Sequence, residues 1–414
     1  MALAHIPRPK SKPDLRTTRK LISLCHDLLS DGNGVRAAEA IRLFETLDQP
    51  GRLAFFDVLI RDFSPSPEDV ARIAEDYRLD PSPGNLKRLQ QIVEPPRQEL
   101  FRRLNMAAGG TRKLIEMRAF VLAETESHPE LEPIADDLGH LLGSWFNSGF
   151  LTLERIDWNS PAVVLEKLIE YEAVHQIQGW HDLRRRLEAD RRCYGFFHSA
   201  LPNEPLNFIE VALTRGMSDK IQPLIDPDAP VSDPIAADSA IFYSITNCQP
   251  GLRGVPLGGS LIKQVVEDLR KSLSRLRTFA TLSPIPGFRD WLAQEHPNLL
   301  DEPQPESKQR LLSLCAWYLL HVKRDSEPLD AVARFHLRNG ARVERINWMA
   351  DPSPVGIRQS AGLMANYVYE LNDLQRNHEL YAHGGDIPAS GRMERLARQV
   401  GKNKNPNWLT RHFG

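Results

Sequence analysis

The sequence predicts an α+β fold in which an all-helical N-terminal domain is followed by a domain with a mixed sheet. Apolar residues recur at helical spacing through residues 14–149, with almost no alternating strand pattern there. After Leu151, short runs rich in strand formers begin, and amphipathic helical stretches separate them. We therefore divide the chain into a helical domain over residues 1–150, with an expected role in oligomerisation, and a second domain over residues 151–414.

The helices of the first domain follow from their apolar stripes and start signals. Two stripes at helical spacing cover residues 21–29 and 37–47. The segment 64–67, Ser-Pro-Ser-Pro, interrupts the pattern and begins the next helix, because proline is well tolerated in a first turn. Further helices are predicted at residues 85–93, 96–105, 111–124 and 131–147.

The second domain alternates strand and helix signals, which is typical of a sheet with covering helices. Strands are predicted at residues 205–214, 239–246, 277–283, 342–347 and 366–371. Helices are predicted at residues 261–273, 288–295, 307–322 and 330–339. The segment from Gly385 onward is basic and polar, and we expect it to be partly loose.

The balance of charge excludes several classes of partner. The 52 Lys and Arg nearly balance the 54 Asp and Glu, giving a net charge of −2. No field of that size favours nucleic acid or a membrane surface, so neither is an expected partner. The most apolar stretch, residues 311–322, is shorter than the roughly 20 residues that span a bilayer. With no secretory signal and no Ser-Lys-Leu ending, we expect a cytoplasmic protein.

The four cysteines and the histidines indicate neither disulfides nor a metal site. No two cysteines form a C-x-x-C pair, and we interpret all four as free thiols in a reducing compartment. Cys25 and Cys315 lie within apolar helical patterns and are expected in the core. None of the thirteen histidines has the H-E-x-x-H spacing of a zinc site, so no metal is expected.

A glycine-rich turn, NCQPGLRGVPLGGS, connects the strand at 239–246 to the helix at 261–273. Gly251, Gly254, Gly258 and Gly259 would let the backbone approach a ligand. The first amides of the following helix favour an anion, so a pyrophosphate suits this turn. The spacing matches neither a P-loop nor a dinucleotide fingerprint. An ordinary glycine turn is the alternative.

Two short motifs resemble the GNAT acyltransferase superfamily. The turn is similar to its CoA-binding motif R/Q-x-x-G-x-G/A through Arg253 and Gly258, although Pro256 stands where glycine is usual. The later segment AVARFHLRNGA resembles A-x-x-F-Y-x-x-x-G-F, with His336 in the place of the tyrosine that acts as general acid and Gly340 in that of the glycine. The resemblance implies a GNAT-like catalytic domain that binds a CoA thioester.

A longer resemblance, across about residues 155–370, is to the malonyl-CoA decarboxylase family. Its runs occur in order and include DWNSP, RRCYGFFH, SPIPGF, FHLRNGA and INWMAD. The resemblance implies conversion of malonyl-CoA to acetyl-CoA and CO2 with no metal or organic cofactor, and assembly into homotetramers. Some family members carry a glutamate where this chain has Pro256, so a role for that carboxylate does not apply here.

The resemblance also implies the site residues. Carried over by motif, the catalytic pair is Ser283 in LSPIPGF and His336 in FHLRNGA, and Tyr369 in NYVY is a partner of the histidine. The residues implied to contact CoA are Arg253, Gly254, Val255, Pro256, Leu257, Gly258 and Gly259.

These residue types suit a decarboxylation. Loss of CO2 leaves an enolate whose electrons the thioester accepts, so the protein must orient the carboxylate, stabilise the thioester oxygen and supply a proton. Pro284 and Pro286 fix the backbone beyond Ser283, and histidine suits proton transfer near neutral pH. We hypothesise that Ser283, hydrogen-bonded to His336, binds the carboxylate or the departing CO2. His336 then protonates the enolate, directly or through Ser283.

Several alternatives remain at this point. Ser283 could simply bond its own backbone at a strand end, and His336 could be a core residue bonded to a carbonyl. Ser283 lies outside a G-x-S-x-G elbow, which argues against a thioesterase of the α/β-hydrolase type. The other functions considered are a GNAT-type acyltransferase that uses an amine acceptor and a non-catalytic CoA-binding scaffold.

Overall fold

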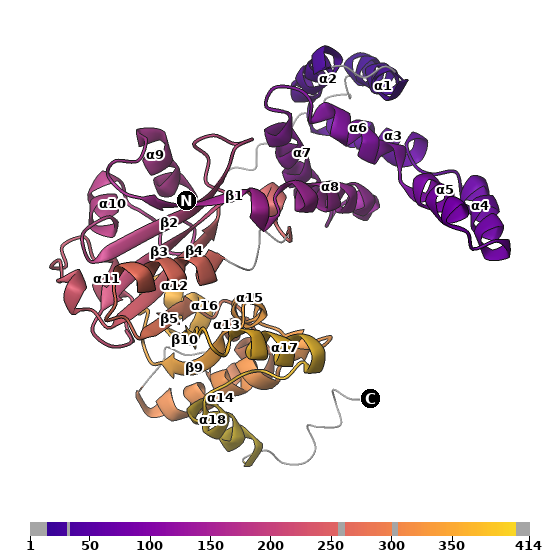
Figure 1. The fold of residues 1–414 in the computed structure, drawn as a ribbon. Coiled ribbons are helices and arrows are strands. Elements are labelled where there is room, and N and C mark those ends of the chain that lie inside the picture. Colours follow the sequence, from indigo (N-terminus) through magenta and orange to yellow (C-terminus); the bar gives the residue numbers. More distant parts are fainter. Residues whose placement is uncertain (1–14, 31–33, 256–260, 300–304, 403–414) are drawn as a thin grey trace, which may run out of the picture. The chain divides into compact units, whose positions relative to one another are not determined.

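The structure is a computed structural model of the 414-residue chain that describes residues 15–30, 34–255, 261–299 and 305–402. The chain divides into two compact units, which we describe separately (Figure 1). Unit 1 comprises Met1–Leu151, His198–Pro202 and Gln249–Leu257, and unit 2 comprises Thr152–Phe197, Asn203–Cys248 and Gly258–Gly414. The two short later segments of unit 1 lie within the range that the predicted division assigns to the second domain.

Unit 1 is built from helices, as predicted. They are α1 (Leu15–Ser30), α2 (Gly34–Thr46), α3 (Gln49–Asp62), α4 (Pro67–Leu79), α5 (Pro83–Val93), α6 (Pro96–Leu104), α7 (Gly110–Glu124) and α8 (Glu132–Trp145). Its core collects the apolar stripes of these helices, including the fully buried Cys25, Phe56 and Leu138. Helix α3 was not predicted, although Asp48 caps it by accepting a hydrogen bond from the Gly51 amide at 2.9 Å.

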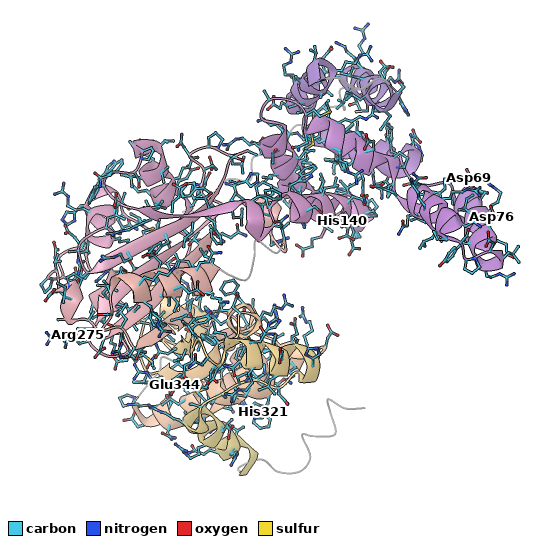
Figure 2. The ribbon with its side chains drawn as sticks, in the orientation of Figure 1. Asp69, Asp76, His140, Arg275, His321 and Glu344 are labelled. Atoms are coloured by element: carbon cyan, nitrogen blue, oxygen red, sulfur yellow. The ribbon has the colours of Figure 1, made fainter. Side chains whose placement is uncertain are left out.

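Serine and proline start the hairpin formed by α4 and α5. Ser66 Oγ accepts a hydrogen bond from the Asp69 amide at 3.2 Å, and Pro67 is the first residue of α4. Figure 2 shows Asp69 and Asp76 on this helix. Asp69 forms an exposed ion pair with Arg72 at 2.8 Å. The start signal read from the Ser-Pro-Ser-Pro segment is therefore confirmed.

Unit 2 contains a mixed sheet, which confirms the predicted α+β class. Its strands are β1 (Leu151–Ile156), β2 (Arg191–His198), β3 (Asn207–Thr214), β4 (Ser239–Asn247), β5 (Thr278–Thr281), β6 (Ser283–Pro284), β9 (Arg342–Asn347) and β10 (Met364–Val368). The order is β1-β2-β3-β4-β5-β10-β6, and β9 also pairs with β10. Strands β4 and β5 are parallel, whereas β10 runs antiparallel to β5, β6 and β9. A short hairpin joins β7 (Lys323–Arg324) to β8 (Glu327–Pro328).

Helices cover both faces of the sheet. They are α9 (Ala162–Tyr171), α10 (Trp180–Arg186), α11 (Gln222–Ile225), α12 (Leu261–Ser272), α13 (Phe288–Glu295), α14 (Lys308–His321), α15 (Ala331–Arg338), α16 (Pro354–Ser360), α17 (Leu374–Gly384) and α18 (Gly391–Lys402). Cys193 packs into a core cluster with Leu165 of α9. Its neighbour Tyr194 points to the opposite face, where its hydroxyl donates to Asp268 of α12 at 2.7 Å.

Strands β4 and β5 pair only over their first residues, Ser239–Phe242 with Thr278–Thr281. Beyond that point β4 continues to Asn247 alongside β3, whereas β5 passes through Leu282 into β6. Because β5 and β6 pair with the same strand, β10, the backbone of Ser283 is held opposite Ala365. The end of the parallel pairing thus positions the predicted serine.

The structure contains several elements of the second domain that were not predicted, including β1, β2, α9, α10, α16 and α17, and it corrects others. The last strand, predicted at residues 366–371, runs instead from Met364 to Val368. Within the segment after Gly385, which was expected to be partly loose, residues 403–414 lie outside the described residues, and residues 391–402 form the unpredicted helix α18. Met393, Ala397 and Val400 are buried there, at the i, i+4, i+7 spacing of an amphipathic helix. The basic residues of this segment lie on its other face, and they masked the pattern.

Two predictions about the sequence as a whole can be compared with the described residues. All four cysteines are free, as predicted, and Cys25 and Cys315 are buried as expected; Cys193 and Cys248, for which burial was not predicted, are buried as well. No helix in the described ranges is both long enough and apolar enough to span a bilayer.

Candidate active site

Ser283 lies in β6 with its side chain buried and its hydroxyl between two polar neighbours. Ser283 Oγ is 2.9 Å from Thr281 Oγ1, to which it donates, and 3.0 Å from His336 Nε2. Thr281 Oγ1 also accepts a hydrogen bond from the Tyr367 amide at 3.1 Å. The serine is therefore bonded to side chains and does not bond its own backbone, which was the alternative considered.

His336 lies in the second turn of α15, whose start is fixed by Asp330. Asp330 Oδ1 accepts a hydrogen bond from the Ala333 amide at 2.9 Å. The imidazole of His336 is buried, and its Nδ1 lies 2.7 Å from the Tyr369 hydroxyl. Its ring also stacks on Tyr367 with the ring centroids 4.5 Å apart. The structure thus brings Ser283, His336 and Tyr369 into one chain of hydrogen bonds.

Burial controls the protonation of this group. Removal from water lowers the pKa of His336 to about 3, because the charged imidazolium loses its hydration. The same cause raises the pKa of Tyr369 well above its usual range. A neutral imidazole carries one N–H. With Ser283 donating to Thr281, the tautomer that satisfies every atom has Nε2–H donating to Ser283 and Nδ1 accepting from Tyr369.

Thr281 and Tyr367 belong to this group, and the sequence analysis missed both. Each lies two residues before a predicted site residue, Thr281 before Ser283 and Tyr367 before Tyr369. Alternate residues of a strand share a face, so the period of two was the available signal. The hydroxyl of Tyr367 is buried and has no hydrogen-bond partner among the described residues.

A second set of contacts joins the loop after Ser283 to the helix that carries His336. The Gly287 amide lies 3.5 Å from Asp330 Oδ2, at the outer limit of a hydrogen bond. A Cβ at Gly287 would overlap the Tyr318 hydroxyl oxygen, so a larger residue there requires the tyrosine ring to shift. Burial raises the pKa of Asp330. The carboxyl group of Asp330 therefore contacts both segments that position the Ser–His pair.

The predicted CoA loop is only partly described. Pro256, Leu257, Gly258 and Gly259 lie outside the described residues. Residues 250–252 form a 3-10 helix, and Gly254 turns the chain with φ of +79°. Arg253 and Gly254 are exposed. The expectation that Gly251 admits a ligand needs correction, because its Cβ position is occupied by the Ile115 carbonyl oxygen of α7.

A cavity of about 450 Å³ opens at the other end of β5. Tyr369 is among its lining residues, but neither Ser283 nor His336 is. Arg342 and Glu344 lie in its wall, 2.9 Å apart at their charged groups, and Figure 2 labels Glu344. This cavity is therefore separate from the Ser–His pair.

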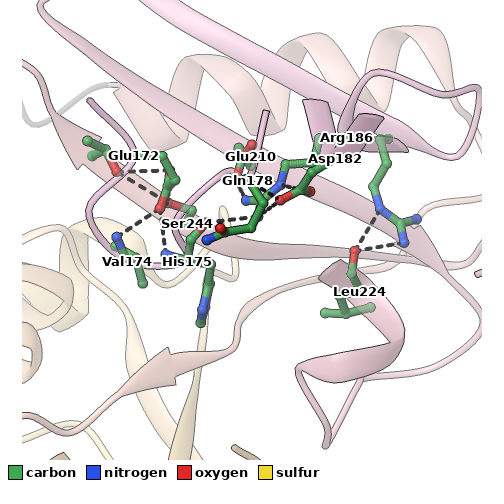
Figure 3. A network of polar contacts seen from close by, with 11 residues as sticks. Glu172, Val174, His175, Gln178, Asp182, Arg186, Glu210, Leu224 and Ser244 are labelled. Atoms are coloured by element: carbon green, nitrogen blue, oxygen red, sulfur yellow. Dashed lines mark hydrogen bonds and ion pairs between the residues drawn. The ribbon is translucent and has the colours of Figure 1, made fainter. Parts of the chain in front are cut away.

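A separate buried polar network lies on β3, β4 and the segment 172–178 (Figure 3). Arg186 donates to Asp182 at 2.9 Å and to Glu210 at 2.8 Å. Glu172 accepts from Ser244 Oγ at 2.7 Å. Burial raises the pKa of Glu210 to about 8. The sequence analysis did not predict this network, which fixes the 172–178 segment to the sheet.

Known proteins are similar to this chain over most of its length. The family model for the malonyl-CoA decarboxylase C-terminal domain matches residues 149–306 and 301–407, and that for the N-terminal domain matches residues 63–146. The chain is 35% identical over 424 residues to mitochondrial malonyl-CoA decarboxylase of Anser anser anser, covering 89% of this chain and 84% of that protein. Crystal structures of malonyl-CoA decarboxylase from Rhodopseudomonas palustris and Agrobacterium vitis are 44% and 43% identical. Each has a TM-score of 0.86 and covers 91% of this chain and 99% of the other.

Proposed function

Because the chain belongs to the malonyl-CoA decarboxylase family, we propose that it converts malonyl-CoA to acetyl-CoA and CO2 with Ser283 and His336 as its catalytic pair. Membership in this family makes it a carboxy-lyase. The observation that carries the proposed roles is the 3.0 Å contact between Ser283 Oγ and His336 Nε2 inside a buried chain of hydrogen bonds. The reaction needs no metal or organic cofactor in this proposal, because the thioester itself accepts the electrons.

The proposed reaction consumes one proton. The bond between the carboxylate carbon and C2 of the malonyl group breaks, and its electron pair forms the enolate of acetyl-CoA as CO2 leaves. C2 then takes a proton. In this proposal the Ser283 hydroxyl binds the carboxylate, and His336 Nε2 supplies the proton directly or through Ser283. The short contact between Ser283 and His336 supports either route.

Substrate binding would also change the charge of the histidine. In the free protein, burial keeps His336 neutral, with a pKa of about 3. A substrate carboxylate beside Ser283 would favour the charged imidazolium, because an opposite charge nearby raises the pKa of a histidine. The ring would then hold a proton on each nitrogen, with Nδ1–H donating to Tyr369. Substrate binding would thus favour the protonation of His336, and this proton is the one that C2 then receives.

We further propose that Arg253 and the backbone of Gly254 and Val255 contact the CoA diphosphate, together with residues 256–259. The exposed guanidinium of Arg253 and the left-handed turn at Gly254 support this role. The expected homotetramer, and the oligomerisation role of residues 1–150, remain predictions. Sedimentation of the purified protein would test them.

The direct test is release of CO2 from malonyl-CoA, with no amine acceptor and with a metal chelator present. Ser283→Ala and His336→Asn should each lower kcat by roughly 10²–10⁴ while CoA binding persists. Ser313→Ala is the matched control, because Ser313 is also buried and hydrogen-bonded but lies on α14, where it bonds Gln399.

The other outcomes identify the competing functions. Acyl transfer that requires an amine, without CO2 release, would indicate an acyltransferase. CoA binding with no turnover would indicate a scaffold. Near-normal turnover in the Ser283 or His336 variant would remove that residue from the mechanism.

A further inference from the structure

We propose that Arg118, in the helical unit, is a positioning residue for CoA, because it holds the backbone of residues 251–254 in the orientation that presents an amide to the diphosphate. This inference rests on the proposed function of that loop. It assigns to the helical unit a part in substrate binding, for which the sequence analysis found no chemical motif. Arg118 and residues 249–257 belong to the same unit of the structure.

Arg118 binds the loop through main-chain carbonyls. Its Nη1 donates to the carbonyl oxygen of Gly251 at 2.6 Å and to that of Arg253 at 2.8 Å. Its Nε donates to the Ala135 carbonyl oxygen of α8 at 2.9 Å. The side chain is buried, with 7% of its surface exposed. One guanidinium group therefore connects α7, α8 and two carbonyl groups of the loop.

The loop lies directly on α7. The missing side chain of Gly251 leaves room only for the Ile115 carbonyl oxygen, as described above. Leu252 and Val255 are buried beside it. Between them, Arg253 and Gly254 are exposed. The buried residues therefore anchor the loop on both sides of its exposed turn.

The bond to the Arg253 carbonyl sets the direction of the next amide. The peptide bond between Arg253 and Gly254 is trans, as are all those described. In a trans peptide, the C=O and the following N–H point in opposite directions. Since the carbonyl points to Arg118, the Gly254 N–H points away from it. No described group accepts a hydrogen bond from this amide. An unpartnered amide at an exposed glycine turn suits a phosphate oxygen.

Charge supports the same ligand. The three hydrogen-bond acceptors of Arg118 are neutral carbonyls, and the Asp136 carboxylate partly offsets the effect of burial by acting to raise the pKa of Arg118. Burial and the neighbouring Arg253 guanidinium both lower the pKa of Arg118. The influence of Arg253 means that two cationic side chains lie near each other at the loop. A diphosphate would be attracted by both of them.

The test compares two thioesters that differ only in the part of the substrate that this loop would contact. Malonyl-CoA carries the diphosphate and nucleotide, whereas malonyl-pantetheine lacks both. For malonyl-CoA, Arg118→Met should raise KM roughly 10-fold or more, with kcat changed less than about three-fold. For malonyl-pantetheine, both constants should stay as in the unsubstituted protein. Arg118→Lys should give an intermediate KM, because it keeps one donor and the charge.

Two further variants separate positioning from stability. Gly251→Ala would push the loop away from α7 and should reproduce the selective rise in KM. Arg97→Met is the matched control, because Arg97 is also a buried arginine of unit 1 but bonds Asp137 and Ser64. It should leave both KM values unchanged even if it lowers the melting temperature.

The inference is overturned if Arg118→Met impairs the two thioesters equally, or if it lowers kcat without changing KM. If Arg118→Met does not fold, the KM values of Gly251→Ala for malonyl-CoA and malonyl-pantetheine test the inference in the same way. If the unsubstituted protein releases no CO2 from either thioester, the proposed function fails. Calorimetric binding of CoA and of pantetheine then tests Arg118 separately, and an equal loss for both ligands would again overturn the inference.

Discussion

Two tyrosines beside His336 offer a matched pair of substitutions, Tyr369→Phe and Tyr367→Phe. Both side chains are fully buried, and both rings contact the imidazole. They differ in one respect. The Tyr369 hydroxyl lies 2.7 Å from His336 Nδ1, whereas the Tyr367 hydroxyl has no partner among the described residues. We expect Tyr369→Phe to impair the protein and Tyr367→Phe to leave it nearly unchanged.

The magnitudes follow from the hydrogen bond alone. Tyr369→Phe leaves a buried ring nitrogen unpaired, which costs about 1–3 kcal/mol of unfolding free energy. If the same bond holds the imidazole in the tautomer used in the reaction, kcat should fall by roughly 5- to 150-fold, since each 1.4 kcal/mol is a factor of ten. Tyr367→Phe removes a buried hydroxyl that bonds nothing described. Its unfolding free energy should change by no more than about 0.5 kcal/mol, or rise.

The assays are urea unfolding and the initial rate of CO2 release from malonyl-CoA at saturating substrate. Each ring keeps its contact with the imidazole in the phenylalanine variant, so packing is matched. Equal losses of kcat in the two variants would refute the assigned role of the Tyr369 hydroxyl. A larger loss of kcat in Tyr367→Phe than in Tyr369→Phe would show that the proton path runs through Tyr367 and not through Tyr369.

Three further outcomes follow. Burial lowers the pKa of His336 to about 3 in the folded protein, whereas the pKa of an unfolded histidine is about 6.5. Below pH 6.5 only the unfolded chain takes up this proton, so the free energy of unfolding falls with pH, by about 2 kcal/mol at pH 5. His336→Gln has no such group, so urea unfolding at pH 7, 6 and 5 should show its unfolding free energy rising relative to that of the unsubstituted protein as the pH falls. A difference in unfolding free energy that stays constant over this range would contradict a buried neutral ring. Arg253→Ala should raise KM for malonyl-CoA with little change in kcat, and an unchanged KM would remove Arg253 from the CoA site. Gly287→Ala should lower the unfolding free energy by about 1–3 kcal/mol through overlap with the Tyr318 hydroxyl, and adding Tyr318→Phe should restore it; a double variant as unstable as the single one would contradict the overlap.

Residue spacing was sufficient to predict the helical first domain and several strands of the second. Prediction worked where the apolar period was clear, as in α12, and where proline and serine gave start signals, as at Ser66. It failed for α18, where abundant basic residues obscured the buried stripe. It also missed β2, because a strand buried on both faces shows no alternation of apolar and polar residues.

Motifs in the sequence singled out Ser283, His336 and Tyr369 as the predicted site, but nothing in residue order requires a serine and a histidine 53 residues apart to meet. Their contact depends on the pairing of β6 with β10 and on the start of α15 at Asp330, both of which are set by partners distant in the chain. The neutral state of His336 likewise depends on burial, which only the packed chain creates. Local spacing encodes the period and ends of each element, because those depend on near neighbours. Tertiary packing decides which side chains contact one another and how deeply they are buried. Those contacts and that burial determine the hydrogen bonds and the protonation states of the site.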